Sequence, residues 1–222
     1  MKITLIFSRH KEHGACNVQA LLKIIERVKP DVIFEELSEA LYQEAYEEKT
    51  LNNLESMAIR EYVSKYDVPH IPVDTYQKPP NYESIQNSIF DKLFYGAGYE
   101  SFQLRSFLDQ VQTVIGEYGF SYLNDDSNDM NMEKQASLIH AALEKLNDPK
   151  LKDKYHKDRE VVLKREDVIL DNVYTCCKGN DVKNGLMLIG SGHRRSILRK
   201  IEERAKTEFS KINWHYFSDI YS

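Results

Sequence analysis

The first 37 residues alternate between short apolar runs and one amphipathic stretch. Residues 3–8 are almost entirely apolar or β-branched, which is typical of a buried strand. From 17 to 28 the apolar positions recur every three or four residues, so we predict an amphipathic helix with Asn17 as its cap. The Lys-Pro-Asp sequence at 29–31 ends this helix, and residues 32–34 form a second apolar strand. Together these segments predict a right-handed βαβ crossover and a parallel pair of strands.

Further elements follow from the same two periodicities. Helices are predicted near 38–48, 54–66 and 194–206, and strands at 70–74, 186–189 and 212–217. Pro72 favours an edge position or a strand start for the third strand, because proline cannot donate a ladder hydrogen bond. Residues 77–180 have helical periodicity around a polar loop at 124–131, and we predict a lid-like helical insert that covers one side of the sheet. The predicted fold is a single α/β domain over 1–222, with a mostly parallel sheet and helices on both faces.

Composition narrows the class of protein. The chain has 222 residues, of which 41% are hydrophobic and 29% charged, as in ordinary globular domains. No apolar run reaches the roughly 18–20 residues that cross a bilayer, and charges from Arg9 onward end the first run too early for a signal peptide. Three cysteines without a CxxC pair indicate neither a disulfide framework nor a thiolate zinc site. With a formal net charge of −5, we expect a cytoplasmic protein without a membrane or nucleic-acid partner.

Three polar clusters follow predicted strands that are far apart in the chain. They are Ser8-Arg9-His10-Lys11-Glu12-His13, Glu35-Glu36 and Gly190-Ser191-Gly192-His193. In an open α/β sheet the carboxyl ends of the parallel strands form one edge, and ligands bind in the crevice there. Histidine clusters and a carboxylate pair at such an edge indicate a hydrolytic or metal site.

His10 and the two glutamates are candidates for catalysis or metal binding. His10 lies just past the first strand, and imidazole with carboxylate suits zinc, manganese or cobalt. His13 is a second ligand-binding candidate, or a member of a solvated loop. Glu35 and Glu36 point to opposite faces if their strand continues, so one lines the site while the other caps a helix or meets solvent. A carboxylate there has to be paired, ligating or neutral, because burying a lone charge is too costly.

Arg165 is the clearest internal signal. It lies three residues after Val162 and four before Ile169, on the inward stripe of a predicted helix. An inward guanidinium requires a carboxylate or a substrate anion. Glu35 or Glu36 is its natural partner, or Arg165 stabilises a developing oxyanion, and a purely structural salt bridge is the alternative. Asp74, which ends the third strand, is a candidate for the same edge.

The turn before His193 suits an anionic ligand. Glycines at 190 and 192 permit a tight turn and a close approach to the backbone, and the following helix presents free N–H groups there. Gly190, Ser191 and Gly192 are therefore ligand-binding candidates. His193 beside them is either a catalytic or ligating residue or a structural helix cap.

In this order the motifs resemble the superfamily that includes TraB-type proteins, Tiki-type proteases, erythromycin esterases and certain haem-binding lipoproteins. The matching segments are Phe7-Ser8-Arg9-His10, Lys29-Pro30-Asp31-Val32-Ile33-Phe34-Glu35-Glu36-Leu37, Arg165 and Gly190-Ser191-Gly192-His193. Phe7 stands where that pattern has glycine, and Glu166 where it has a short Asn or Asp. The resemblance implies that His10, Glu35 or Glu36, and His193 act as metal ligands or acid–base groups, with Arg165 in support.

Two functions of different classes follow. The first is a hydrolase that cleaves an ester or amide bond of a small-molecule or peptide substrate, with His10, His193 and Glu35 or Glu36 activating water. Water is activated directly or through a divalent metal (Mn, Co or Zn) held by His10, Glu36 and His193. The alternative is a non-catalytic small-ligand or haem-binding protein on the same fold. A dinucleotide binder is disfavoured, because the chain lacks GxGxxG.

Overall fold

Five parallel strands form the central sheet of the computed structural model, in the order β3–β2–β4–β1–β5. The strands are β1 (Lys2–Ser8), β2 (Val32–Glu35), β3 (His70–Pro72), β4 (Asn184–Gly190) and β5 (Asn213–His215). The structure describes residues 1–179, 182–206 and 212–221. Within them, β3 lies at an edge of the sheet, as Pro72 predicted.

The first βαβ unit does not place its two strands side by side. β1 and β2 are parallel, as predicted, but β4 lies between them and pairs with both. β4 is the most continuously apolar strand, and the central position buries both of its faces. Its pairing with β1 runs in register from Lys2 opposite Asn184 to Ser8 opposite Gly190. The carboxyl ends of β1 and β4 therefore lie next to each other.

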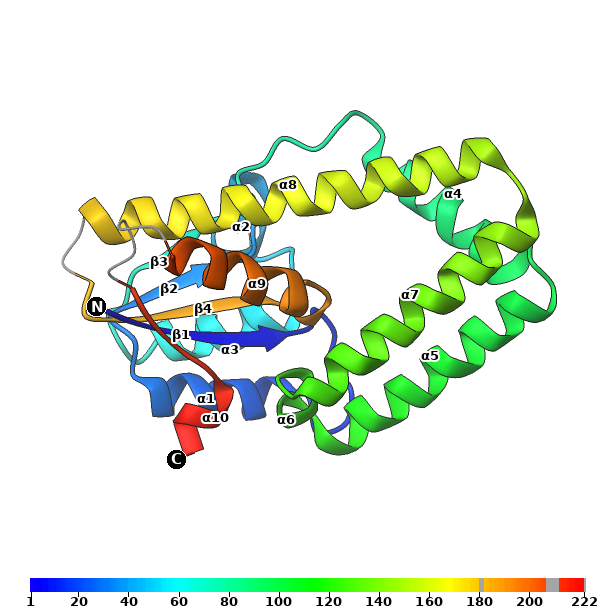
Figure 1. Ribbon diagram of the computed structural model, residues 1–222. Coiled ribbons are helices and arrows are strands. Elements are labelled where there is room, and N and C mark those ends of the chain that lie inside the picture. Colours follow the sequence, from blue (N-terminus) through cyan, green and yellow to red (C-terminus); the bar gives the residue numbers. More distant parts are fainter. Residues whose placement is uncertain (180–181, 207–211, 222) are drawn as a thin grey trace.

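Helices cover both faces of the sheet (Figure 1), which confirms the predicted α/β class. One face carries α1 (Val18–Val28), α3 (Leu54–Val63) and α10 (Phe217–Tyr221), and the other carries α9 (Arg194–Ala205) and the end of α8 (Pro149–Gly179). Side chains of β1 alternate between the two cores: Ile6 packs toward α1, while Leu5 and Phe7 pack toward α8 and α9. α2 (Glu39–Tyr46) follows β2; it contacts α3, and its tyrosines reach Glu35 of β2 and His70 of β3.

Local signals account for the first helix. The side chain of Asn17 accepts a hydrogen bond from the Ala20 amide at 3.0 Å and caps α1, as predicted. At the other end, Lys29 adopts a left-handed conformation (φ 51°) that turns the chain toward β2. The helix therefore begins and ends where the sequence pattern places it.

The predicted insert is helical, but most of it does not cover the sheet. It comprises α4 (Tyr82–Tyr95), α5 (Tyr99–Tyr118), α6 (Phe120–Leu123), α7 (Asp126–Leu146) and α8. The C-terminal half of α8 packs on one face of the sheet, through residues such as Ile169 and Val173, and α6 contacts β1 on the side of the other core. α4, α5 and α7 extend past the carboxyl ends of the strands (Figure 1) around an apolar core of their own that includes Leu93 and Leu143. Residue 180, the predicted end of the insert, lies outside the described residues.

The prediction of a polar loop at 124–131 is wrong. Asp125 caps α7 by accepting a hydrogen bond from the Ser127 amide at 2.9 Å, and the helix begins at Asp126. Asp126 and Asp129 lie in its first turn, where negative charge favours a helix. The acidic residues therefore form the N-terminus of α7. None of the helices described, including the long α8, combines the length and apolar character needed to cross a membrane.

Candidate functional site

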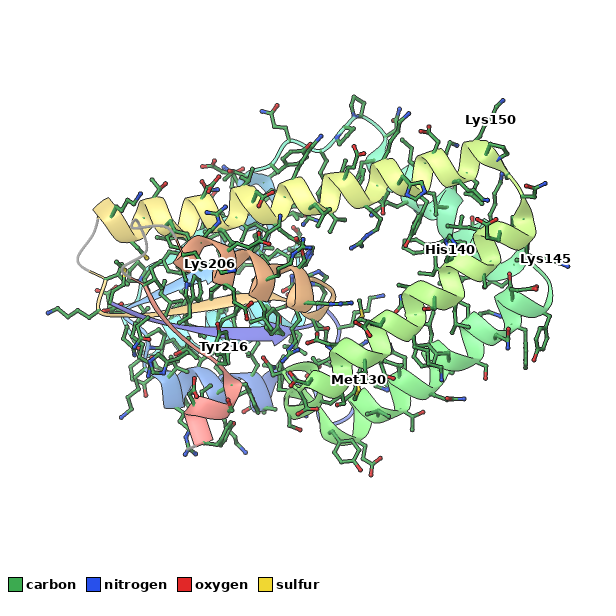
Figure 2. All side chains as sticks on the ribbon, in the orientation of Figure 1. Met130, His140, Lys145, Lys150, Lys206 and Tyr216 are labelled. Atoms are coloured by element: carbon green, nitrogen blue, oxygen red, sulfur yellow. The ribbon has the colours of Figure 1, made fainter. Side chains whose placement is uncertain are left out.

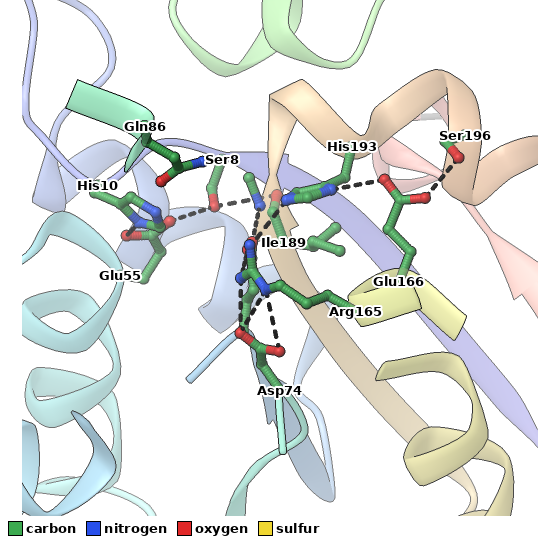
Figure 3. Close-up of polar contacts among 12 residues, drawn as sticks. Ser8, His10, Glu55, Asp74, Gln86, Arg165, Glu166, Ile189, His193 and Ser196 are labelled. Carbon is green, nitrogen blue, oxygen red and sulfur yellow. Dashed lines mark hydrogen bonds and ion pairs between the residues drawn. The ribbon is translucent and has the colours of Figure 1, made fainter. Parts of the chain in front are cut away.

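β1, β2 and β4 end at one edge of the sheet, and the polar side chains that follow them meet there (Figure 3). In the register of the sheet, Ser8 lies opposite Gly190 and Glu35 lies opposite Leu188. Glu36, one residue beyond β2, therefore reaches the end of β4. Glu36 and His193 are therefore brought together, whereas His10 is bonded to Glu55 and shares only a small cavity with Glu36.

Glu36 lies at the centre of this group. Its Oε2 accepts the Gly190 amide at 2.7 Å, while its Oε1 lies 3.1 Å from Nη2 of Arg165 and 3.2 Å from Nε2 of His193. Only 9% of the side chain is exposed. Burial alone raises the pKa of Glu36, but the bonds and charges of His193, the Gly190 amide and Arg165 outweigh it and lower the pKa to about 2. Glu36 is therefore ionised at neutral pH.

His193 is held by carboxylates on both ring nitrogens. Nδ1 lies 2.8 Å from Oε1 of Glu166, and Nε2 faces Glu36. Burial lowers the pKa of His193, but the hydrogen bonds to Glu166 and Glu36 raise it further, to about 9. The other oxygen of Glu166 accepts the Ser196 hydroxyl at 2.5 Å. His193 is thus an imidazolium at neutral pH and donates both of its N–H groups.

Arg165 faces inward, as the helical stripe predicts. Its Nε and Nη2 bind Asp74 at 3.1 and 2.6 Å, and Nη2 also contacts Glu36. The partners of the arginine are therefore Asp74 and Glu36, which both lie at this edge of the sheet. Nη1 of Arg165 makes no hydrogen bond within the described part of the chain, so one pair of donors stays available.

The two adjacent glutamates point to opposite faces, as predicted for a continuing strand. On the far side from Arg165, Glu35 is buried, with Oε1 2.8 Å from Nδ1 of His70. Oε2 of Glu35 accepts the Tyr46 hydroxyl at 2.5 Å. Of the pair, Glu36 bonds to Arg165 and His193, while Glu35 bonds to His70 and Tyr46 and shares only the small cavity with Glu36.

His10 forms a pair with Glu55 of α3. Nδ1 of His10 lies 3.3 Å from Oε2 of Glu55, and the other oxygen of Glu55 accepts the Ser8 hydroxyl at 2.7 Å. The imidazole is 61% exposed, and its Nε2 has no hydrogen-bond partner among the residues described. The hydrogen bond to Glu55 raises the pKa of His10 by more than burial lowers it. Figure 3 shows this pair on one side of Arg165 and the pair of His193 and Glu166 on the other.

A small cavity lies between His10, Glu36 and Glu55. Its volume is about 10 Å³, close to the space that one water molecule requires. It is lined by His10, Glu35, Glu36, Leu37, Asn53, Glu55 and Leu188. The imidazole of His10 and the carboxylates of Glu36 and Glu55 therefore share one cavity wall.

The other predicted residues lie in different surroundings. His13 packs against α5: a Cβ added at Gly116 would lie 2.9 Å from Nε2 of His13. The structure therefore does not bring His13 to Glu36 or His193.

Ser191–His193 form a single 3₁₀ turn that leads into α9, and Gly192 in this turn is exposed. The Gly190 amide, predicted to face a ligand, is instead bonded to Glu36.

Two acids that hold the histidines, Glu55 and Glu166, were not among the residues predicted from sequence. Glu166 is only 1% exposed, and it lies four residues after Val162 and three before Ile169. That spacing places it on the inward stripe beside Arg165, so the signal was present in the sequence. Glu55 carries no such signal, because an acid in the first turn of a helix is common for reasons of helix stability.

The arrangement of these side chains does not fit a divalent metal. Across residues 1–179, 182–206 and 212–221, no group of three or more His, Cys, Asp or Glu side chains is placed to hold an ion. The physical reason lies in His193, because a metal ligand has to be a neutral imidazole, and both of its nitrogens donate to carboxylates. The metal set of His10, Glu36 and His193 stays a prediction that this geometry does not support.

Comparisons with known proteins do not place this chain in a family. It matches no family model, no curated protein and no solved structure. Its function therefore rests on the chemistry of the side chains at the sheet edge.

We expect the free energy of unfolding to decline on both sides of a maximum between about pH 4.5 and 6.5. The pKa of His193 rises from 6.5 to about 9 on folding, so its contribution is complete below pH 6.5 and is lost as pH rises toward 9. The pKa of Glu36 falls from 4.5 to about 2, so its contribution is complete above pH 4.5 and is lost as pH falls toward 2.

Urea denaturation across this pH range measures the effect. The alkaline decline is expected to be about 2–3 kcal/mol, since each pH unit between the two pKa values of His193 contributes about 1.4 kcal/mol. His193→Gln should remove most of the alkaline decline, and it should also weaken the acid one, because His193 is a main cause of the lowered pKa of Glu36. A wild-type stability that stays constant from pH 6.5 to 9 would contradict the imidazolium assignment.

Proposed function

We propose that this protein is a hydrolase of esters or amides in which His10 is the general base that activates water. The observation that carries the proposal is the pair of His10 and Glu55. The carboxylate holds Nδ1 at 3.3 Å and leaves Nε2 without a partner in the described chain. This is how an acid–histidine pair prepares an imidazole to accept a proton.

The small cavity beside His10 has room for the attacking water. With about 10 Å³ between His10, Glu36 and Glu55, it accommodates one water molecule among polar partners. His10 would take one proton of that water as its oxygen attacks the carbonyl carbon. The proton then passes to the leaving oxygen or nitrogen when the tetrahedral intermediate collapses.

Arg165 is the candidate donor for the oxyanion. Its Nε and Nη2 are fixed by Asp74 and Glu36, and Nη1 remains available for the carbonyl oxygen. A donor that is already oriented stabilises developing negative charge without reorganisation. His193 acts as a positioning residue, because it holds Glu36 in place while its own ring is held by Glu166, which accepts the Ser196 hydroxyl.

This assignment accords with the resemblance to the TraB, Tiki and erythromycin esterase superfamily, which we retain as the proposed family. No step of this mechanism uses a metal, because the ring nitrogens of His193 are bonded to carboxylates. Metal analysis of protein purified without an affinity tag or chelator tests that choice. A stoichiometric ion whose removal abolishes turnover would contradict it.

The proposal is tested by hydrolysis of a panel of p-nitrophenyl esters and anilides, with Glu55→Gln as the key variant. For the wild type, kcat/KM should rise with pH through a pKa above 6.5, since His10 has to be neutral to act as a base and Glu55 raises its pKa. Glu55→Gln should reduce kcat about tenfold to a hundredfold and move this rise to lower pH, because the carboxylate that raises the pKa is gone.

Glu61→Gln is the matched control. Glu61 lies on the same helix as Glu55, but it bonds to Lys65 and Gln19. Its variant should keep the wild-type rate and pH profile. Two results would contradict the proposal: no turnover of any ester or anilide in the panel, or a pH profile that Glu55→Gln leaves unchanged.

A further inference from the structure

A second, larger opening lies next to the candidate site, between α7, α8 and α9. Its volume is about 710 Å³, within the range of small-molecule sites. α7 and α8 are joined far from the sheet and diverge toward its carboxyl edge (Figure 1), and side chains from both helices project into the space between them (Figure 2). We refer to this opening, bounded by Arg159, Gly192, Arg195 and Arg199, as the arginine cleft.

The arginine cleft is basic, although the chain as a whole carries a formal net charge of −5. Arg159 comes from α8, and Arg195 and Arg199 come from α9, while Glu133 is the one acid in its lining. Glu133 pairs with Arg195 at 2.6 Å, and Arg199 lies 3.8 Å from Glu203. Arg159 is exposed and has neither a hydrogen bond nor an ion pair in the described chain. The guanidinium of Arg159 can therefore bind an anion in the cleft.

The cleft continues to the candidate catalytic site. Ser196 lines it, and the Ser196 hydroxyl donates to Glu166, the residue that holds His193. Gly192 also lines it, and nothing lies within 4 Å of the position that a Cβ would occupy there. The cleft therefore borders the turn at the end of β4 that carries His193.

Apolar side chains complete the cleft. Ile139 of α7 and Tyr155 and Leu163 of α8 line it together with the arginines. Arg159 and Arg165 are six residues apart on one helix, which separates them by about 9 Å along its axis. A ligand that reaches both needs a body of at least that length, and the lining favours an apolar one.

We propose that the substrate is an ester or amide with an apolar body and a terminal anionic group, which Arg159 binds while the carbonyl lies near Arg165. This inference rests on the proposed hydrolase function and specifies its substrate. The shared chemistry is an oxyanion, carried either by a carboxylate or by a phosphate group. Arg159 is here a specificity residue, because it contacts the end of the substrate remote from the reacting bond.

The test compares two p-nitrophenyl esters of equal carbon number, the neutral octanoate and the anionic monoester of suberic acid. Arg159→Ala should lower kcat/KM for the suberate ester about tenfold and leave that for the octanoate ester unchanged, since only the former carries the anion. Lys164→Ala is the matched control, because Lys164 is an exposed cation of α8 outside the cleft lining. It should change neither value. Equal losses on both esters in Arg159→Ala would overturn the proposal.

A binding measurement separates this proposal from the catalytic one. Calorimetry of free suberate and of 8-phosphonooctanoate on the His10→Ala protein reports anion binding without turnover. Binding that Arg159→Ala weakens about tenfold in the His10→Ala background supports the cleft even if no ester is hydrolysed, and the tighter of the two ligands identifies carboxylate or phosphate as the preferred group. Absence of binding by both, or binding that Arg159→Ala leaves unchanged, would overturn it.

Discussion

Replacing His10 with alanine is expected to reduce kcat for the hydrolysed ester by about 10²–10⁴-fold, the usual contribution of a general base. The fold should be unaffected, because the imidazole is 61% exposed and the carbonyl of His10 still accepts the Leu54 amide at 2.8 Å. We expect the free energy of unfolding to change by less than about 0.5 kcal/mol. Steady-state kinetics and urea denaturation of the same preparation measure the two quantities.

His140→Ala is the control for this experiment. His140 lies on α7 (Figure 2), its ring is 74% exposed, and it lines neither the small cavity nor the arginine cleft. Its variant should keep the wild-type kcat. Added imidazole should restore part of the rate of His10→Ala, because a free base then replaces the missing side chain. A His10→Ala protein with more than about a tenth of the wild-type rate would show that another group accepts the proton.

Replacing Glu36 with alanine is expected to lower the free energy of unfolding by about 3 kcal/mol at pH 7. The change removes one carboxylate partner from each of two largely buried cations, Arg165 and His193. It also leaves the Gly190 amide without its acceptor at 2.7 Å, and an unsatisfied buried donor adds to the loss. Urea denaturation measures the effect, provided that the slope of the unfolding free energy against urea concentration is the same for both proteins.

Two further variants make this stability result specific. Glu36→Gln keeps an oxygen for the Gly190 amide but removes the charge, so its loss should be smaller than that of Glu36→Ala. Glu61→Ala removes a more exposed carboxylate from α3 and should change stability by less than about 1 kcal/mol. Were Glu36→Ala no more destabilised than Glu61→Ala, Glu36 would not be the centre of the buried ion network described above.

The order of elements and the direction of several side chains were predictable from sequence. The apolar run of β1, the Asn17 cap and the break at Pro30 act within a few residues, so they are visible without a fold. Helix and strand periods also decide which side chains share a face. For this reason the residue pattern alone places Arg165 inward, and Glu35 and Glu36 on opposite faces.

Only the tertiary structure decided which groups meet. His10 and Glu55 are 45 residues apart, and His193 and Glu166 are 27 apart, with no local pattern that links them. These pairings depend on β4 lying between β1 and β2, a position that packing on both sheet faces determines. The same is true of the arginine cleft, because the divergence of α7 from α8 is set by the separate apolar core that holds the insert together. Sequence therefore determined the types of residue at the sheet edge, and long-range packing determined their partners.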